Sequence, residues 1–224
     1  MYEAFLKDTL AMSALTCAET IAFHFTPAEE EKSARRLVRQ LSLGARNERR
    51  FTFRPQAGET FAQRIAGSFE AEKSAGGEEL VMIGSDSPTL TPGVVDTAFD
   101  FIYNRSGMAV GPSGEGGVFL IGVPSSAPMD YAKVFSEGSE LENLVGQARA
   151  ASMPFMLLPE TVDVDVEPDL VTLVGMIRAL EYERRFDARV FPTHTHKVME
   201  ELGLVVVRSP DGGTRSKRIE LTRA

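Results

Sequence analysis

The residues with the clearest chemical potential are four carboxylates in three short segments. Each segment follows an apolar run that is typical of a strand. The segments are Gly84–Pro88 with Asp86, Gly111–Gly117 with Glu115, and Val162–Val166 with Asp163 and Asp165. In the last of these, the two aspartates alternate with valines, so an extended chain would place both carboxylates on one face.

Carboxylate oxygens suit a hard cation such as Mg²⁺ or Mn²⁺. A cation held by Asp86, Asp163 and Asp165 would bridge phosphate oxygens and neutralise the charge of a departing phosphate group. The glycines around Glu115 would let backbone N–H groups approach a ligand closely. We therefore predict Mg²⁺ or Mn²⁺ as the cofactor, bound where these segments meet.

Each segment also has a purely structural interpretation. Asp86 can form a turn by accepting a hydrogen bond from its own backbone. The two later aspartates can be the polar edge of a strand, with Asp169 favouring the start of the next helix. The glycine-rich segment can be an ordinary hairpin loop. It is their joint position after strands that favours a functional site.

Histidine and cysteine are weaker candidates for a functional site. His194 and His196 lack a third metal ligand, and Cys17 has no basic neighbour in sequence to activate it. The chain contains no phosphate-binding Walker loop, no Gly-x-Ser-x-Gly nucleophile motif and no Gly-x-Gly-x-x-Gly dinucleotide motif. No nucleophile for covalent catalysis is therefore evident.

The segments are positioned by alternating strand and helix patterns. Apolar runs at 19–25, 50–54, 80–83, 108–111, 118–123 and 155–158 predict strands, and amphipathic stretches between most of them predict helices. This alternation predicts a three-layer α/β fold with a mostly parallel, doubly wound sheet. In such folds ligands bind beyond the carboxyl ends of the strands, where the acidic segments lie.

A second unit is expected at the end of the chain. Residues 204–208 and 218–221 alternate as two strands, and Asp211, Gly212 and Gly213 form a turn signal between them. We therefore predict a catalytic domain at 1–202 and a β-hairpin appendage at 203–224.

Composition and net charge limit the kinds of partner that the protein could bind. The 224 residues are 43% hydrophobic, as expected of a chain that buries a sizeable core. A net charge of -8 disfavours binding to nucleic acid or to anionic membrane surfaces. Cys17 is the single cysteine, which suits the reducing cytoplasm, and no run approaches the roughly 20 apolar residues that span a bilayer.

Several ordered motifs resemble a bacterial family of GT-A-type (nucleotide-diphospho-sugar transferase-like) glycosyltransferases, related to molybdenum cofactor and phospholactate guanylyltransferases. The motifs are the helix Tyr2–Leu10, the segment Gln56–Arg64, the turn Gly84–Pro88, the loop Gly111–Gly117 and the segment Asp163–Leu170. The resemblance implies that Asp86 and Asp165 are metal ligands and that Arg64 reaches a phosphate. It also implies that Ser85, Gly116 and Gly117 contact substrate, and that Asp86 and Glu115 serve catalysis.

Two departures from the family pattern bear on function. Glu115 stands where the family usually has aspartate. The chain also starts after the first strand and the basic loop Lys-x-Pro-x-x-Gly-x-x-Lys-Thr-Arg-Leu that the family carries. We expect that strand to belong beside the one that ends at Asp86, and we expect coding sequence for it upstream of Met1.

The leading functional hypothesis is a metal-dependent glycosyltransferase acting on a nucleotide diphosphate-sugar and an unknown acceptor. A nucleotidyltransferase that releases pyrophosphate would use the same site. A nucleotide-binding protein that has lost catalysis is the alternative outside the enzymes. A homodimer is compatible with each hypothesis.

Overall fold

The computed structural model describes residues 1–136, 138–187, 190–210 and 216–222. Its helices are α1 (Tyr2–Ser13), α2 (Glu31–Gln40), α3 (Ala45–Glu48), α4 (Phe61–Ser74), α5 (Pro92–Arg105), α6 (Tyr131–Val134), α7 (Glu140–Ala150), α8 (Glu167–Glu183) and α9 (Thr193–Leu202), with 3-10 turns η1 (Ala28–Glu30) and η2 (Gly114–Gly116). Its strands are β1 (Ile21–Phe25), β2 (Phe51–Pro55), β3 (Glu79–Ile83), β4 (Met108–Pro112), β5 (Val118–Pro124), β6 (Phe155–Leu157), β7 (Leu204–Arg208) and β8 (Lys217–Leu221).

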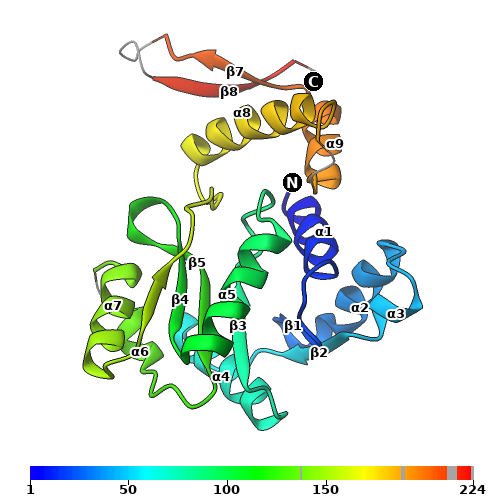
Figure 1. Ribbon diagram of the computed structural model, residues 1–224. Coiled ribbons are helices and arrows are strands. Elements are labelled where there is room, and N and C mark those ends of the chain that lie inside the picture. The colour runs from blue at the N-terminus through cyan, green and yellow to red at the C-terminus, as the bar shows by residue number, and fades with distance from the viewer. Residues whose placement is uncertain (137, 188–189, 211–215, 223–224) are drawn as a thin grey trace.

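The main sheet has the order β3-β5-β4-β6 and lies between two helical layers (Figure 1). Alternating residues of its strands enter different cores, as the pleat requires. Met108 and Val110 of β4 pack with α4, α6 and α7, whereas Ala109 packs on the opposite face with α5. The predicted three-layer α/β architecture is confirmed.

The direction of one strand and the continuity of the sheet differ from a simple parallel arrangement. β3, β4 and β6 point the same way, but β5 runs antiparallel to both of its neighbours. The sheet is therefore mixed. Only residues 113–117 separate β4 from β5, and a parallel connection needs about a dozen residues or more, so the two strands must form a hairpin.

β1 and β2 form a separate parallel pair. In Figure 1 this pair stands beside β3, and within the described residues β3 has a hydrogen-bonded strand neighbour only in β5. The free edge of β3 is the place where the sequence analysis expected an additional strand. Apolar side chains of the pair, including Phe51, pack instead with α1 and α2 in a separate small core.

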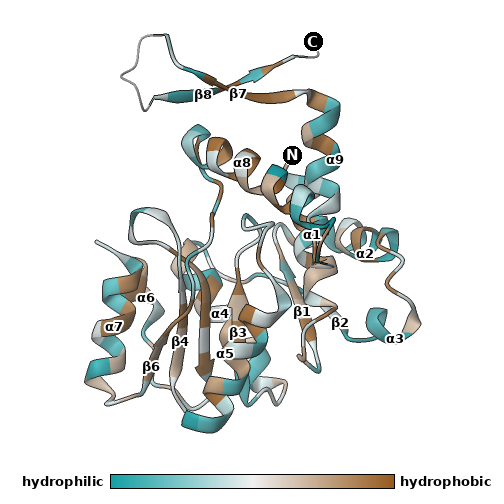
Figure 2. Ribbon diagram, turned by 45° about the horizontal axis from the view of Figure 1, so that its top comes forward, coloured by the Kyte–Doolittle hydropathy of each residue, from teal (hydrophilic) through white to brown (hydrophobic). Residues whose placement is uncertain are grey.

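The C-terminal strands pair as predicted, with Leu204 opposite Leu221. The expected turn residues Asp211, Gly212 and Gly213 lie outside the described residues. The hairpin is not independent of the rest, because Leu204, Val206 and Ile219 share a core with α1, α8 and α9 (Figure 2). The domain boundary at 202/203 stays a prediction. No helix in the described part of the chain is both long enough and apolar enough to cross a membrane.

Candidate active site

The turn after β3 holds Asp86 in a fixed position. The Gly84 N–H donates to the Phe119 carbonyl over 2.9 Å, which keeps the start of the turn on the sheet. The Leu90 N–H donates to the Ser87 carbonyl over 3.0 Å, and both of these residues are buried. The turn is thus anchored at each end, and Asp86 projects between the anchors, half-buried.

Hydrogen bonds join the segment 161–165 to this turn. The Val164 N–H donates to the Asp86 carbonyl over 3.1 Å, and the Ser87 hydroxyl donates to Asp163 Oδ1 over 3.0 Å. The Thr89 and Thr161 hydroxyl oxygens lie 3.2 Å apart and extend the contact. Two segments separated by more than 70 residues therefore present Asp86 and Asp163 to one another.

The alternation predicted for the third segment holds for two of its valines. Val162 and Val164 pack against the core formed by α1, α8 and α9. Val166 does not enter this core and is 58% exposed at the N-cap position that precedes α8. Asp163 and Asp165 thus alternate with partly buried valines.

Asp169 fixes the backbone at Asp165. Its Oδ2 accepts hydrogen bonds from the Asp165 N–H over 3.1 Å and from the Val166 N–H over 3.0 Å. A carboxylate at this position also complements the positive end of the helix dipole. Asp169 is therefore a structural residue, as the alternative interpretation proposed, and it leaves the Asp165 side chain exposed to solvent.

The electrostatics of the cluster favour a cation. Burial raises the pKa of Asp86, and the negative charge of Asp165 raises it further. Burial also raises the pKa of Asp163; the hydrogen bond from Ser87 acts against this, and the charges of Asp165 and Asp86 act with it. Each ionised carboxylate makes the others harder to ionise, so a bound cation would relieve the mutual repulsion.

The arrangement fits a metal ion that is shared with a ligand. Among the described residues, no three His, Cys, Asp or Glu side chains converge closely enough to hold an ion without other ligands. Mg²⁺ typically uses one or two carboxylates together with substrate phosphates and water. Asp86 and Asp165, whose charges interact, match that smaller set.

Ser85 extends the polar site toward α1. Its hydroxyl donates to Asp86 Oδ1 over 3.4 Å and lies 3.3 Å from the Tyr2 hydroxyl. The Thr9 hydroxyl donates to the Ser85 carbonyl over 3.5 Å. Tyr2 and Thr9 are two helical turns apart on one face of α1, and their place in the first family motif was the signal that could have assigned them to the site.

The family is decided by the sequence comparison. Residues 10–137 match the family model described as "Uncharacterized protein conserved in bacteria (DUF2064)". The chain belongs to this family. The match includes Asp86 and the glycine-rich loop and ends before Asp163. Comparison with curated protein sequences gives no match.

Solved structures show that this DUF2064 protein has the fold of the nucleotide-diphospho-sugar transferases, as the motifs indicated. A structure from Desulfovibrio desulfuricans G20, described as a nucleotide-diphospho-sugar transferase, is 22% identical with a TM-score of 0.68, over 88% of this chain and 80% of that one. A cytidylyltransferase from Leptospira borgpetersenii serovar Hardjo-bovis is 14% identical with a TM-score of 0.52, over 88% and 83%.

The glycine-rich loop of the DUF2064 protein is fixed on α7. Ser139 Oγ donates to the Gly116 carbonyl over 2.9 Å, and a side chain at Gly116, where φ is +82°, would place its Cβ 2.6 Å from that oxygen. The Gly117 N–H donates to the Gly114 carbonyl, which closes the turn. Gly116 is therefore required by its positive φ and by Ser139, whereas at Gly117 the constraint is that a Cβ would lie 2.9 Å from Ser113 Oγ.

Glu115 lies at the tip of this loop in a left-handed conformation with φ +57°, and its side chain is exposed. Among the described residues, the carboxylates whose charges act on Asp86 and Asp163 come from their own cluster and from Asp169, and Glu115 is not one of them. The structure thus leaves Glu115 free to meet a ligand but does not bring it into contact with the aspartates.

Within the described residues, no hydrogen bond or ion pair joins Arg64 to the aspartate cluster. Its Nη1 donates to the Glu59 carbonyl over 3.2 Å, beside the start of α4. A phosphate-binding role for Arg64 stays a prediction and would require the guanidinium to leave this carbonyl.

The histidines and Cys17 contact other parts of the chain. The His194 N–H donates to Asp8, and the His196 ring lies 3.5 Å from a Glu181 carboxylate oxygen. Burial raises the pKa of Cys17 to about 11, and hydrogen bonding and charge from Asp96 contribute. The thiol is therefore protonated at neutral pH.

Proposed function

We propose that this protein is a divalent metal-dependent transferase that takes a nucleotide diphosphate-sugar as donor and transfers its sugar to an acceptor. The observation that carries the proposal is that Asp86 and Asp163 are brought together after β3 and that the charge of Asp165 acts on both. Two partly buried carboxylates beside a third, exposed one are costly, and such a cluster is typical of a cation site. The transferase fold supports the choice of a diphosphate ligand.

The residues would divide the work as follows. Asp86 and Asp165 would hold Mg²⁺ or Mn²⁺ against the diphosphate. Bound there, the cation supplies neutralisation of the negative charge that develops on the departing nucleoside diphosphate. Asp163, held by Ser87, keeps the turn and the 161–165 segment together. Glu115 would orient the acceptor hydroxyl or accept its proton.

Nucleotidyl transfer is the second candidate, because the fold is also similar to that of a cytidylyltransferase. The two reactions differ in their products. Sugar transfer releases a nucleoside diphosphate, whereas nucleotidyl transfer from a nucleoside triphosphate releases pyrophosphate and leaves the nucleoside monophosphate in the product. A nucleotide-binding protein without turnover would bind the same ligands and release neither. In each case the net charge of -8 disfavours nucleic acid as a partner, and we propose that the site takes small molecules in the cytoplasm.

The proposal is tested by thermal denaturation with nucleotides and nucleotide sugars, in the presence and absence of Mn²⁺. Binding to the folded state adds about 2.7 kcal/mol to the free energy of unfolding at a ligand concentration of 100 times Kd, and the midpoint of thermal unfolding rises as a result. We expect a Mn²⁺-dependent rise that Asp86→Asn and Asp165→Asn both abolish. Asp100→Asn, a charge-matched change on the exposed side of α5, should leave it unchanged.

Two results would count against the proposal. Ligand stabilisation that survives both site substitutions would show that the aspartates do not hold the metal. If none of the nucleotides tested stabilises the protein, the proposal that its ligand is a nucleotide is wrong. Where binding is found, incubation with candidate acceptors and analysis of the released nucleotide distinguish the reactions, and Glu115→Gln should slow turnover more than it weakens binding.

A further inference from the structure

Among the described residues, β7 has a strand neighbour only in β8, and the hydrogen-bonding groups of its other edge can be assigned. The Thr222 N–H donates to the Gly203 carbonyl over 2.9 Å, and the Ser209 N–H donates to the Ser216 carbonyl over 3.0 Å. In an antiparallel pair such rungs occur at every second residue. Leu204, Val206 and Arg208 therefore point their N–H and C=O groups away from β8.

The corresponding edge of β8 is protected. Glu167, at the start of α8, accepts a hydrogen bond from the outward N–H of Ile219 over 2.9 Å. At β7, within the described residues, one outward group has a partner: Arg178 Nη2 donates to the Leu204 carbonyl over 2.7 Å. The hairpin forms the outer end of the molecule, with β7 at its limit in Figure 1. Pairing with another chain is thus available at β7.

The centre of β7 has no feature that opposes pairing. Native edges are usually protected by charges, proline or bulges. The centre of β7 is Val205, Val206 and Val207, and its register with β8 is regular. Among the described residues, Leu202 at the end of α9 and Leu221, opposite Leu204, are exposed large apolar side chains beside the start of β7.

The pattern of open groups is symmetric about Val206. In an antiparallel pair of two copies centred there, Val206 faces Val206 of the second copy, and Leu204 faces Arg208. All three outward residues of both strands then find partners, since the Leu204 carbonyl can accept a second hydrogen bond. Val205 and Val207 become cross-strand neighbours, a favourable β-branched pairing.

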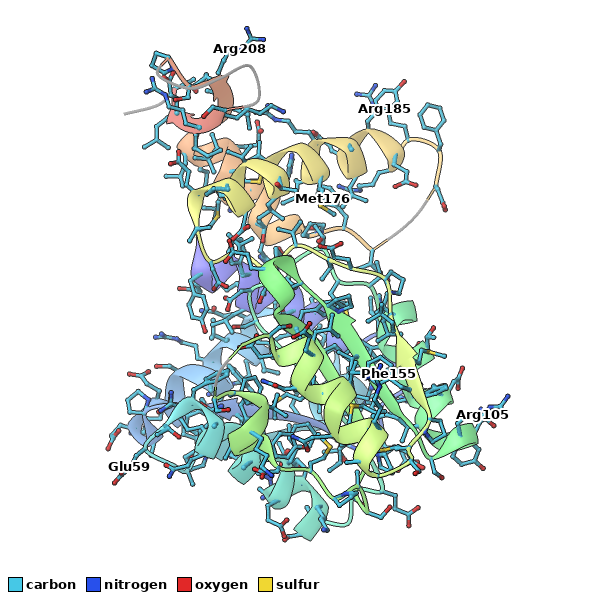
Figure 3. The ribbon with its side chains drawn as sticks, turned by 90° about the vertical axis from the view of Figure 1, so that its left-hand side faces the viewer. Glu59, Arg105, Phe155, Met176, Arg185 and Arg208 are labelled. Carbon is cyan, nitrogen blue, oxygen red and sulfur yellow. The ribbon has the colours of Figure 1, made fainter. Side chains whose placement is uncertain are left out.

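Charges support the same arrangement. Arg208 is exposed and projects from the end of β7, as Figure 3 shows. In the symmetric pair it lies opposite Leu204, next to the end of α9 in the second copy. That helix ends with the exposed residues Glu200 and Glu201, and the C-terminus of a helix favours a cation. The contact occurs twice because of the two-fold symmetry.

We propose that β7 pairs with β7 of a second copy of this chain, so that the two hairpins form one four-stranded antiparallel sheet. The inference does not depend on the proposed activity. The strand has five residues, so the interface is smaller than the roughly 1,200–2,000 Å² of stable complexes, and the dimer should dissociate on dilution.

The test is sedimentation velocity on the full chain at about 10–300 μM, a range that spans a micromolar Kd. We expect a concentration-dependent dimer. Val206→Pro removes the outward N–H and no hydrogen bond of the hairpin, so it should give a monomer with an unchanged circular dichroism spectrum. Val206→Ala removes the same side-chain packing but keeps the N–H, and it should still dimerise.

A second pair of variants tests the charge contact. Arg208→Glu should raise the dissociation constant about 5-fold or more, because it places a carboxylate against Glu200 and Glu201. Arg185→Glu, a matched reversal at the far end of α8, should not change it. A wild-type protein that stays monomeric throughout the range, or a Val206→Pro variant that dimerises as the wild type does, would overturn the proposal.

Discussion

Asp8 links the two ends of the chain, and its removal should destabilise the protein strongly. It lies on α1, is 5% exposed, and accepts hydrogen bonds from the backbone N–H groups of His194 over 3.0 Å and Thr195 over 2.7 Å. These are unpaired donors in the first turn of α9. Asp8 therefore caps a helix that lies more than 180 residues away in sequence.

The expected cost of Asp8→Ala has two parts. Loss of an N-cap costs about 0.5–2 kcal/mol, and each buried N–H left without an acceptor costs about 1–3 kcal/mol. Burial is the largest influence on the pKa of Asp8 and raises it, so the ionised carboxylate also carries a desolvation cost that alanine removes. We therefore expect a net loss of about 2–3 kcal/mol in the free energy of unfolding.

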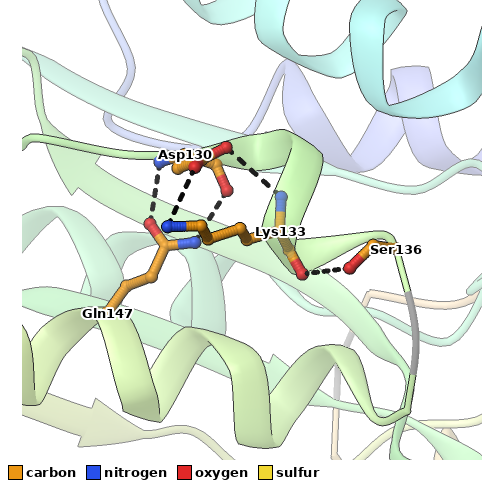
Figure 4. A network of polar contacts seen from close by, with 4 residues as sticks. All are labelled: Asp130, Lys133, Ser136 and Gln147. Carbon is orange, nitrogen blue, oxygen red and sulfur yellow. Dashed lines mark hydrogen bonds and ion pairs between the residues drawn. The ribbon is translucent and has the colours of Figure 1, made fainter.

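The measurement is urea unfolding followed by far-ultraviolet circular dichroism, since the chain contains no tryptophan. Asp130→Ala is the matched control. Asp130 caps α6 by accepting from the Lys133 N–H over 3.3 Å in an exposed network that also includes Gln147 (Figure 4). This cap joins neighbours in sequence, and its loss should cost about 1 kcal/mol or less. Equal losses in the two variants would refute the argument that Asp8 is an anchor between distant segments.

Three further outcomes are expected. Asp163→Asn should raise the free energy of unfolding without metal by about 1 kcal/mol at pH 7, because it removes one of the repelling charges. The folded pKa of this aspartate is raised, so the stability that the wild type gains from its protonation is present below about pH 4 and is lost as pH rises. Thermal scans should therefore show the advantage of the variant shrinking from pH 7 toward pH 4. A destabilised Asp163→Asn variant would contradict the repulsion. Gly116→Ala should lower the midpoint of thermal unfolding by several degrees, because its Cβ meets Ser139 Oγ and its φ is positive, whereas Gly114→Ala has open space and should change it little. Cys17 should react with iodoacetamide at pH 7.5 about 100-fold more slowly than an unperturbed thiol, because its pKa is about 11. Mass spectrometry follows the adduct, and a normal rate would show that the pKa of the thiol is not raised.

The candidate site was predictable where its chemistry follows local sequence. The apolar run before Gly84 and the alternation of Asp163 and Asp165 with valines place these aspartates after strands, and the structure brings them together with Asp86. Whether they hold a metal stays a prediction. Tyr2 was not assigned to the site: its contact with Ser85 spans 83 positions, and only its place in the first family motif pointed to it.

Sequence by itself determined the order and type of most elements, because hydrophobic period and turn residues act over a few positions. It also contained the signal for the antiparallel β5: the connection from β4 is too short for a crossover. Tertiary structure alone decided which strands became neighbours. The insertion of β5 between β3 and β4, the separation of the β1–β2 pair and the capping of α9 by Asp8 all depend on contacts between distant residues. Such contacts arise from the packing of whole faces, which no short stretch of sequence specifies.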